Sequence, residues 1–503
     1  MKSIWQKLHK LGDFLHIPDF PNWVLAILVL ALILRIPSFF EPYYYGDEMI
    51  YLTLGQGIRH GLLLYRDIFD NKPPLLYLTA ALAGNLFWFK TILAFWNIVT
   101  IAFFYKLAAK LFAKKESVQM VSTFIFAVLT TIPLFEGSIV NAELFMVGFT
   151  IIALYILLSE NLNSKKIFLA GILFGIGTLF KVPAALDAPI IVVYWLITTD
   201  FKDWGKVIKH SLVLFSGFIL PIIISLLFFF LKGSLSSYIT AAFLQNVGYL
   251  SSYRPGDVQK SFLVRNAPLL IRALIVFVGV VILYLSRKKL SKNFILFCVW
   301  TFLGLFAVTL SERPYPHYFI QVVAPVSFLL GLFFADKSVE QALTVLPLAL
   351  SFFVPVYYKF YYYNTSAYYQ RFINFATRKT DKTEYFQDFG STVNRNYQIA
   401  DFLVNSSLPN DKVFIWNSDS ATIYALSRRL PPIKYVADYH VTDYSNTTEI
   451  ANEIIRRPPK FIILASSNSY PELNGLIKEK YLLVSQIQNA DIYSLINLAP
   501  QAK

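Results

Sequence analysis

Long apolar runs, separated by short polar loops, fill most of this chain of 503 residues. A bilayer core needs about 20 predominantly apolar residues per helix, and many of the runs reach or approach that length. Charged residues make up 15% of the chain, below the roughly 25% of soluble domains. The pattern therefore predicts a polytopic membrane protein. About eleven spans are expected, at residues 22–40, 86–112, 118–135, 143–159, 167–180, 184–199, 210–231, 263–286, 294–310, 318–335 and 341–358.

The stretch before the first span, residues 1–21, is long and partly amphipathic, and no small-residue cleavage site follows the span. These features favour an interfacial helix followed by a retained span over a cleaved signal peptide. The single cysteine, Cys298, falls inside a predicted span and excludes internal disulfides.

The net charge of +14 comes mostly from loops that follow every second span. The positive-inside rule assigns such loops to the cytoplasm. We therefore expect a cytoplasmic N-terminus, and we expect the loop of residues 43–77 and the C-terminus on the outer face of the plasma (inner) membrane. Because the basic excess follows from topology, no nucleic-acid partner is expected. The basic residues of these loops are Lys106, Lys110, Lys114, Lys115, Lys165, Lys166, Lys202, Lys206, Lys209, Arg287, Lys288, Lys289 and Lys292.

The chain becomes polar after the last span, which predicts a transmembrane domain, residues 1–358, and an extracytoplasmic domain, residues 359–503. Alternating strand and helix patterns in the second part indicate a small α/β domain. The predicted fold class is thus mainly α, a polytopic helical domain with external juxtamembrane helices and a small C-terminal α/β domain. Strands are expected at residues 413–416, 434–439, 461–466 and 481–487, and helices at 421–430 and 449–457.

The first external loop, residues 43–77, is densely charged, and charges this close to a bilayer are costly unless they bind something. Asp47 and Glu48 precede an amphipathic helical pattern, residues 51–58, that would lie along the membrane plane. They form either a solvated pair favoured by the helix dipole or a catalytic pair that takes a proton from an acceptor hydroxyl or amine. The charged residues of the loop are Asp47, Glu48, Arg59, Arg66, Asp67, Asp70 and Lys72.

Lys72 stands directly before Pro73 and Pro74, which break any helix where the chain re-enters the membrane. It is either an ordinary interfacial lysine that reaches toward the headgroups or a partner for the phosphate of a lipid carrier, for which a point charge serves well. Asp70 is a candidate for the substrate cavity, and supporting structure is its stronger interpretation.

Three further cations are candidate phosphate ligands. Arg313 and His317 lie at the external end of the ninth span, and each is either a ligand or an interfacial side chain. Lys181 ends a glycine-rich span whose small residues allow close helix packing. It either binds the phosphate or pairs with Asp187 or Glu143.

Polar residues of other external segments complete the set of candidates. Glu143, in the second external loop, is a candidate for catalysis, and Asn141 before it is a candidate for the substrate cavity. Glu136 is a weaker candidate in the same region. Tyr249 lies in a polar, tyrosine-rich segment, residues 245–257, that forms either a mobile flap over the site or a passive surface loop.

Several of these motifs, taken together, resemble the C-type (GT-C) membrane glycosyltransferases. The closest similarity is to the branch that holds the protein O-mannosyltransferases (the dolichyl-phosphate-mannose-protein mannosyltransferase family) and the lipid A aminoarabinose transferases. The resemblance covers roughly the whole membrane domain, and the polar tail carries no matching motif. The motifs are GDEMIY at 46–51, YRDIFDNKPPLLY at 65–77, NAE at 141–143, GILFGIGTLFKVPA at 171–184 and SERPYPHYFIQ at 311–321.

The resemblance implies an integral-membrane enzyme that moves a sugar from a polyprenyl-phosphate donor to an acceptor on the outer face, with inversion. It implies that Asp47 is the general base, that Lys72 holds the donor phosphate, and that Glu143 matches the family's second-loop acid loosely. The chemistry agrees, because the phosphate leaves as an anion that needs positive charge more than a proton. The acceptor, a protein hydroxyl, a glycolipid or a cell-envelope polysaccharide, stays open, as does the sugar.

No cofactor is expected. The carboxylates of Asp47, Glu48 and Glu143 could supply oxygen ligands to a divalent cation. Their spacing demands no metal site, and the resemblance implies transfer without a metal.

Two other functions fit a polytopic chain. A transporter or flippase of lipid-linked sugars would carry charges at the bilayer midplane and often show internal repeats. Here the unusual charges gather on one outer face, which favours an enzyme that acts at the membrane surface. A scaffold whose outer tail binds a partner is disfavoured by the clustered acids of the first external loop.

Overall fold

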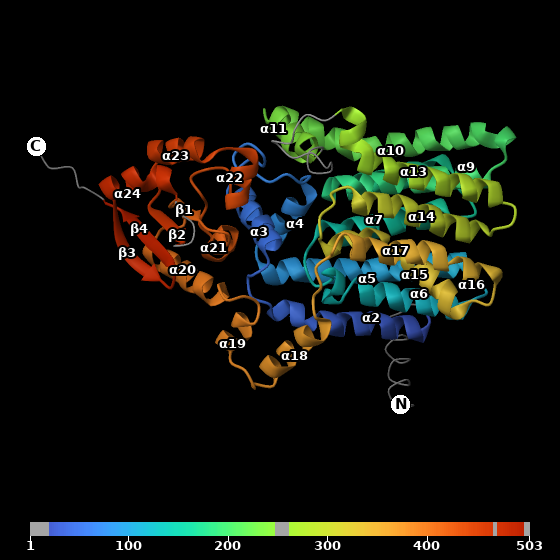
Figure 1. Cartoon of the computed structure of the whole chain (residues 1–503), viewed down its shortest axis with the longest axis horizontal. Coiled ribbons are helices and arrows are strands. Elements are labelled where there is room, and N and C mark those ends of the chain that lie inside the picture. Colours follow the sequence, from blue (N-terminus) through green and yellow to red (C-terminus); the bar gives the residue numbers. More distant parts are fainter. Residues whose placement is uncertain (1–19, 247–260, 466–469, 497–503) are drawn as a thin grey trace, which may run out of the picture. The chain divides into compact units, whose positions relative to one another are not determined.

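The computed structural model describes residues 20–246, 261–465 and 470–496 (Figure 1). Nearly all of the predicted interfacial helix and Tyr249 lie outside these residues. The chain forms two compact units. A helical unit comprises residues up to 38, 90–232 and 243–365, and a mixed unit comprises residues 39–89, 233–242 and 366–503. The predicted boundary at residue 358 stays a prediction, since the mixed unit draws on both the first external loop and the tail.

Each of the eleven predicted spans coincides with a helix. Within the described residues, 7 helical stretches are long and apolar enough to cross a membrane. The other four spans match the shorter α6, α7, α8 and α9, so the count of eleven crossings stays a prediction. The helices are α2 (Asn22–Arg35), α5 (Leu86–Leu111), α6 (Glu116–Leu129), α7 (Ala142–Leu157), α8 (Ser164–Phe180), α9 (Ala188–Thr198), α10 (Trp204–Leu231), α13 (Phe262–Ser286), α14 (Lys292–Thr309), α15 (Ile320–Ala335), α16 (Val339–Leu343) and α17 (Val345–Tyr357).

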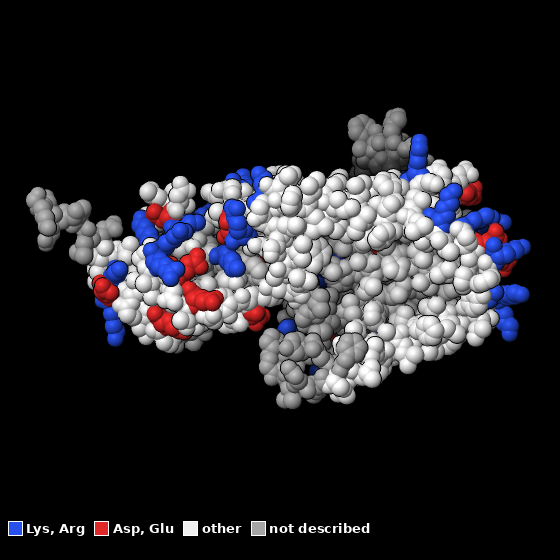
Figure 2. All heavy atoms as spheres, turned by 90° about the horizontal axis from the view of Figure 1, so that it is seen from above, with Lys and Arg blue, Asp and Glu red and all other residues white. Residues whose placement is uncertain are grey.

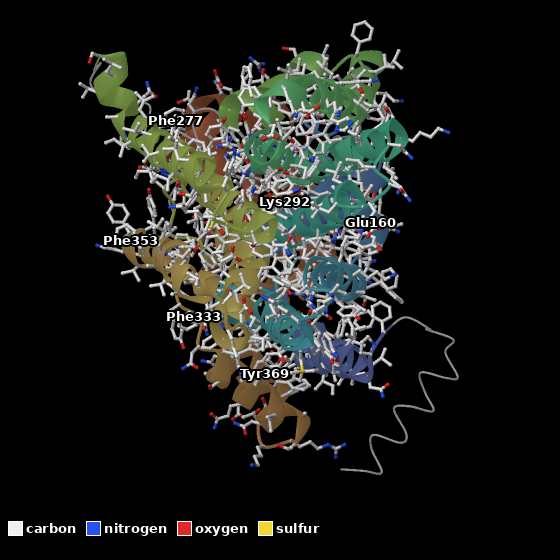
Figure 3. The ribbon with its side chains drawn as sticks, turned by 90° about the vertical axis from the view of Figure 1, so that its right-hand side faces the viewer. Glu160, Phe277, Lys292, Phe333, Phe353 and Tyr369 are labelled. Atoms are coloured by element: carbon white, nitrogen blue, oxygen red, sulfur yellow. The ribbon has the colours of Figure 1, made fainter. Side chains whose placement is uncertain are left out.

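The outer surface of the helical unit is apolar along the helices and basic at one end. Phe277, Phe333 and Phe353 lie exposed on the outside of the bundle (Figure 3). Figure 2 shows Lys and Arg gathered at one end of this unit, where loops such as 287–292 lie. Apolar sides suit lipid, in which helices satisfy their own backbone groups. The helical unit is therefore membrane-embedded, while its orientation and the identity of the membrane stay predictions.

Glycines bring two helices of this unit into close contact. A Cβ atom added to Gly171 or Gly175 of α8 would collide with the carbonyl oxygen of Leu214 or Phe218 in α10. The predicted close packing of the glycine-rich span is thus confirmed at these two positions. It fixes the end of α8, where Lys181 follows.

The mixed unit contains a four-stranded sheet in the order β1-β2-β4-β3. β1 pairs with β2 in parallel, and the other two pairings are antiparallel. The small C-terminal α/β part of the predicted fold class is confirmed. The elements are α3 (Gly46–Arg59), α4 (Leu75–Ala83), α11 (Leu235–Ile239), α18 (Thr365–Ala376), α19 (Lys382–Gln387), α20 (Val393–Ser406), β1 (Val413–Trp416), α21 (Ser420–Ser427), α22 (Asp438–Tyr444), α23 (Thr447–Arg456), β2 (Phe461–Ala465), α24 (Asn474–Lys480), β3 (Tyr481–Ile487) and β4 (Ala490–Leu495).

Three of the four predicted strands are confirmed as β1, β2 and β3. The strand predicted at 434–439 is wrong: this stretch makes a single bridge, from Tyr435 to Phe69, and α22 begins at Asp438. Its apolar residues are buried in a connection, which a short apolar run does not distinguish from a strand. The sequence analysis missed β4, which pairs with β3 in a hairpin. The two turn residues, Gln488 and Asn489, lack the glycine of the usual two-residue hairpin signals.

The helix predicted after Asp47 is present as α3, but it is enclosed by protein. Residues 48–57 are all buried, and α3 packs against α4 and α21. Thr53 Oγ1 lies 3.2 Å from the carbonyl oxygen of Ala421, and Gln56 Nε2 donates to that of Ala425 at 3.0 Å. This packing fixes the first turn of α3 beside the start of α4, and the C-terminal tail helps to hold it.

Candidate active site

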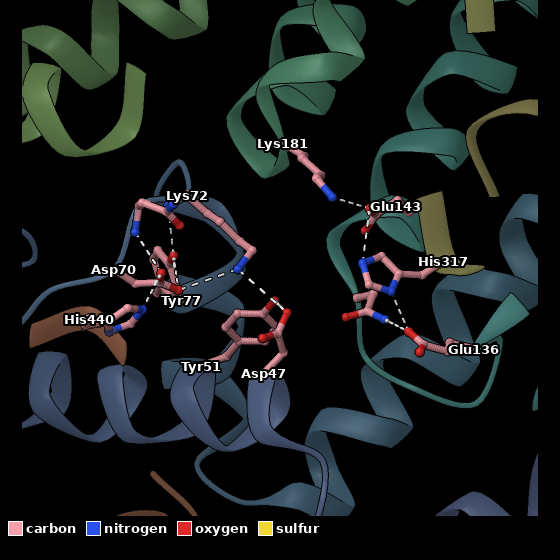
Figure 4. Close-up of polar contacts among 12 residues, drawn as sticks. Asp47, Tyr51, Asp70, Lys72, Tyr77, Glu136, Glu143, Lys181, His317 and His440 are labelled. Atoms are coloured by element: carbon pink, nitrogen blue, oxygen red, sulfur yellow. Dashed lines mark hydrogen bonds and ion pairs between the residues drawn. The ribbon is translucent and has the colours of Figure 1, made fainter. Parts of the chain in front are cut away.

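The mixed unit brings Asp47 and Lys72 into contact. Lys72 Nζ lies 3.7 Å from Oδ2 of Asp47 and 3.7 Å from Oδ2 of Asp70 (Figure 4). Asp47 stands in the first turn of α3, and Lys72 precedes Pro73 and α4. The sequence suggested separate positions for a base and a phosphate partner at the two ends of the loop. The structure instead places the lysine between two carboxylates.

Two buried tyrosines orient these carboxylates. Tyr51, one turn after Asp47 in α3, donates its hydroxyl to Asp47 Oδ2 at 2.8 Å. Tyr77 of α4 donates to Asp70 Oδ2 at 2.8 Å. Burial, followed by the charges of Asp47 and Asp70, raises the pKa of Tyr51 well above its usual value. Both hydroxyls therefore stay protonated and act as fixed donors.

The backbone around Lys72 is also fixed. Tyr65 donates its hydroxyl to the carbonyl oxygen of Lys72 at 2.8 Å, and the Lys72 N–H donates to the Tyr77 hydroxyl at 3.1 Å. Tyr65 itself has φ 71, a left-handed conformation that costs of order 1–3 kcal/mol for a residue other than glycine. Such strain persists only where the surrounding structure determines it, which indicates a closely specified loop.

Asp70 is the buried member of this cluster. Its side chain is 1% exposed, and His440 Nε2, from α22, lies 3.3 Å from its Oδ1. Burial raises the pKa of Asp70, but the Lys72 charge and the His440 hydrogen bond outweigh burial, so the pKa lies below its usual value. Asp70 is thus a permanent anion that holds Lys72. His440 was missed because nothing in the sequence links the tail to the first external loop.

The charged side chains of this loop differ in how far a ligand can reach them. The side chains of Lys72 and Asp47 are 21% and 30% exposed, whereas Glu48 is 0% exposed. Of the two adjacent acids, only Asp47 presents its carboxylate to a ligand. Arg66 and Asp67 pair with each other at 2.8 Å on the surface of the loop. They therefore serve as supporting structure.

The helical unit contains a second cluster, in which His317 bridges two glutamates (Figure 4). His317 Nδ1 lies 2.5 Å from Glu136 Oε2, and its Nε2 lies 3.8 Å from Glu143 Oε1. Asn141 donates to the same Glu136 oxygen at 3.0 Å. Glu143 in turn forms an ion pair with Lys181. Glu136, the weaker candidate from the sequence, is therefore a full member of this cluster.

Helix ends position these groups. Asn141 is the N-cap residue of α7 and Glu143 lies in its first turn, where the helix dipole favours negative charge. Lys181 is the C-cap of α8. The sequence left Asp187 and Glu143 as possible partners of Lys181, and in the structure the partner is Glu143. Asp187 instead accepts hydrogen bonds from Thr150 and Gln321.

The second cluster leaves little room for a ligand. A cavity of about 20 Å³ adjoins Glu143, Lys181, Tyr318 and Gln321, and a volume of this order holds about one water. Lys181 Nζ lies 3.9 Å from the centre of the Tyr318 ring, a cation–π contact. The candidate Arg313 lies exposed in the loop before Pro316. Within the described residues, no group of three or more acidic, histidine or cysteine side chains is arranged to hold a metal, and metal independence stays a prediction.

Residues 71–229 match a family model described as dolichyl-phosphate-mannose-protein mannosyltransferase. The match begins beside Lys72 and ends within α10. Among curated proteins, none matches this chain in sequence.

Two solved structures of ArnT from Cupriavidus metallidurans are similar in fold. The structure bound to undecaprenyl phosphate has a TM-score of 0.58 at 13% identity, covering 95% of this chain and 98% of that one. The apo structure has a TM-score of 0.57 at 12% identity, covering 94% and 98%. At this identity, the likeness establishes the fold alone. The chain has a GT-C membrane fold, and the family match supports the predicted enzyme class, a glycosyltransferase.

Proposed function

We propose that this protein transfers a sugar from a polyprenyl-phosphate donor to an acceptor at the Asp47–Lys72 site. The observation that carries the proposal is the partly exposed lysine held 3.7 Å from a partly exposed carboxylate. The mannosyltransferase family match includes Lys72, and the similar ArnT structure is bound to undecaprenyl phosphate. These findings support the donor class. We further propose the outer face of the plasma membrane as the location.

The proposed reaction uses Asp47 as general base. Asp47 takes the proton from an acceptor hydroxyl or amine, and the acceptor atom attacks the anomeric carbon from the side opposite the phosphate. A bond from the acceptor to that carbon forms as the bond to the phosphate oxygen breaks, which inverts the configuration. The lipid phosphate leaves with the electron pair as an anion, and Lys72 stabilises its charge.

Glu48 and the second cluster take supporting roles in this proposal. Glu48 is enclosed within α3 and shapes the first turn. Glu143 neutralises Lys181, and Glu136 lies against His317. Lys181, His317 and the exposed Arg313 are secondary candidates for the donor phosphate. The acceptor is a protein hydroxyl, a glycolipid or a cell-envelope polysaccharide.

The test is transfer by the purified full chain in proteoliposomes supplied with polyprenyl-phosphate sugars and candidate acceptors. Asp47→Asn keeps the shape of the side chain but removes the base, so we expect transfer to be lost in a protein that remains folded. Lys72→Ala should raise the donor KM. Asp67→Asn, in the same loop but paired with Arg66, is the matched control and should retain activity. Full activity of Asp47→Asn would overturn the assignment of the base.

The same vesicles distinguish the enzyme from a flippase of lipid-linked sugars. An enzyme releases free polyprenyl phosphate and forms a glycosylated acceptor, whereas a flippase moves the intact donor between leaflets. Donor movement without acceptor glycosylation would overturn the proposed function.

A further inference from the structure

The C-terminal tail encloses the loop that carries Lys72. The Phe69 N–H donates to the carbonyl oxygen of Lys434 at 2.9 Å, and Asn71 Nδ2 donates to the Tyr444 hydroxyl at 2.7 Å. The Phe69 ring packs against the rings of Tyr435, His440 and Tyr444. Residues 434–444 therefore hold residues 69–71 on both sides of Asp70.

His440 is the residue of this segment whose side chain contacts a charged group of the site. His440 Nε2 lies 3.3 Å from Asp70 Oδ1, and each side chain is 1% exposed. The opposite Asp70 oxygen faces Lys72 Nζ at 3.7 Å. Asp70 thus links an imidazole of the tail to the amine of Lys72.

The surroundings of the ring indicate its tautomer. His440 Nδ1 is buried and has no hydrogen-bond partner within the described part of the chain. A buried N–H left unpaired is more costly than an unpaired lone pair, so we assign the proton to Nε2, which donates to Asp70. In this arrangement the His440 N–H orients the Asp70 carboxylate, whose other oxygen faces Lys72 Nζ.

We propose that His440 is a positioning residue for Lys72, which it holds through Asp70 in the geometry that binds the donor phosphate. The inference rests on the proposed function and assigns the tail a part in donor binding. Without the hydrogen bond from His440, the Asp70 carboxylate is held only by the Asn71 N–H at 2.7 Å and the Tyr77 hydroxyl at 2.8 Å among the described hydrogen bonds. Its orientation toward Lys72 is then less closely fixed.

The experiment measures the affinity of the purified full chain for undecaprenyl phosphate and the donor and acceptor KM values. His440→Leu removes the hydrogen-bond donor but keeps a side chain of similar size, whereas His440→Gln retains an N–H group that can reach Asp70. We expect His440→Leu to weaken undecaprenyl phosphate binding by about tenfold, as for loss of one hydrogen bond to a charged group. The donor KM should rise in parallel while kcat at saturating donor and the acceptor KM change little.

Matched variants separate positioning from general damage. His440→Gln should restore most of the affinity, and Thr442→Ala, exposed on the same helix, should bind as the native protein does. In an Asp70→Asn background, His440→Leu should have no further effect, because the link is already broken. If His440→Leu does not fold, His440→Asn replaces it, since its shorter amide loses contact with Asp70.

The outcomes distinguish this inference from the proposed function. Native affinity in His440→Leu, together with weak binding by Lys72→Ala, overturns the positioning role and leaves the function intact. Equal losses in folded His440→Leu and His440→Gln also overturn it, because shape alone would then matter. Native affinity in Lys72→Ala overturns the phosphate role of Lys72 itself, and with it the proposed function of this site.

Discussion

Lys72 Nζ lies 3.7 Å from Asp47 Oδ2, so the proposed phosphate ligand and the proposed base partly neutralise each other in this structure. A donor phosphate and Asp47 are both anionic and compete for the same amine. In the proposed reaction, the phosphate that binds Lys72 weakens the hold of the lysine on Asp47, and the carboxylate becomes a better proton acceptor. Donor binding thereby prepares the base, which favours an order in which the donor binds before the acceptor reacts.

This competition predicts that Asp47→Asn separates binding from turnover. The variant should lose transfer but bind undecaprenyl phosphate more tightly than the native protein, because Lys72 no longer has Asp47 as a competing anion. Partly exposed ion pairs are weak, so we expect a gain of at most about fivefold. Equilibrium binding to the purified chain measures it. Weaker binding by a folded Asp47→Asn protein would show that Asp47 supports the phosphate rather than competing with it.

The lowered pKa of Asp70 predicts that the stability of the fold depends on pH. Its pKa in the folded chain is lowered, so the carboxylate stabilises the fold above its unfolded pKa of about 3.9, and this contribution is lost as the pH falls through the folded value. Asp70→Asn should therefore lower the melting temperature at pH 7. The difference between variant and native protein should shrink once the pH falls below about 4.

Thermal unfolding in detergent between pH 3 and 8 measures this effect, and Asp67→Asn is its control. The pKa of Asp67 is also lowered, first by its hydrogen bond from Arg66, but this pair lies on the surface and contributes little. Equal effects of the two substitutions would show that the charge of Asp70 adds no stability beyond that of a surface pair.

The close packing of α3 against α4 at Gly55 predicts that the spacing of these two helices sets the distance between Asp47 and Lys72. A Cβ atom at Gly55 would lie 2.6 Å from the Ala81 nitrogen, whereas one at Gly46 would have nothing within 4 Å. Gly55→Ala should therefore cost about 1–3 kcal/mol of stability and reduce transfer. Gly46→Ala, in the same helix, should melt at or above the native temperature. The same melting temperature for both variants would mean that α3 and α4 separate without cost.

The sequence predicted the helices well because each apolar run is long and bounded by charges, a local property. It also singled out Asp47 and Lys72 as candidate site residues, because their neighbours carry the family motif, and their roles stay predictions. It did not predict that the two side chains touch, since that depends on how α3 packs against α4. His440 could not be found in this way: its contact with Asp70 joins distant parts of the chain, and a single histidine in a polar tail carries no pattern. The wrong strand at 434–439 has a related cause, because burial of these residues comes from tertiary packing.

The pair formed by Lys181 and Glu143 provides a test that separates a structural lysine from a phosphate ligand. The side chains are 14% and 2% exposed, and removing one partner of a buried pair leaves an uncompensated charge. Lys181→Met and Glu143→Gln should each destabilise the fold by about 3 kcal/mol. The double variant should lose less than the sum of the two, since neither charge remains. Thermal unfolding of the four proteins completes the cycle.

Donor binding by the double variant then decides the role of Lys181. If the lysine only neutralises Glu143, the double variant, once stable, should bind undecaprenyl phosphate as tightly as the native chain, because Lys72 remains in place. A large loss of affinity in a folded double variant would instead make Lys181 a second phosphate ligand. The donor would then have to displace Glu143 from Lys181, in the same way that we propose it displaces Asp47 from Lys72.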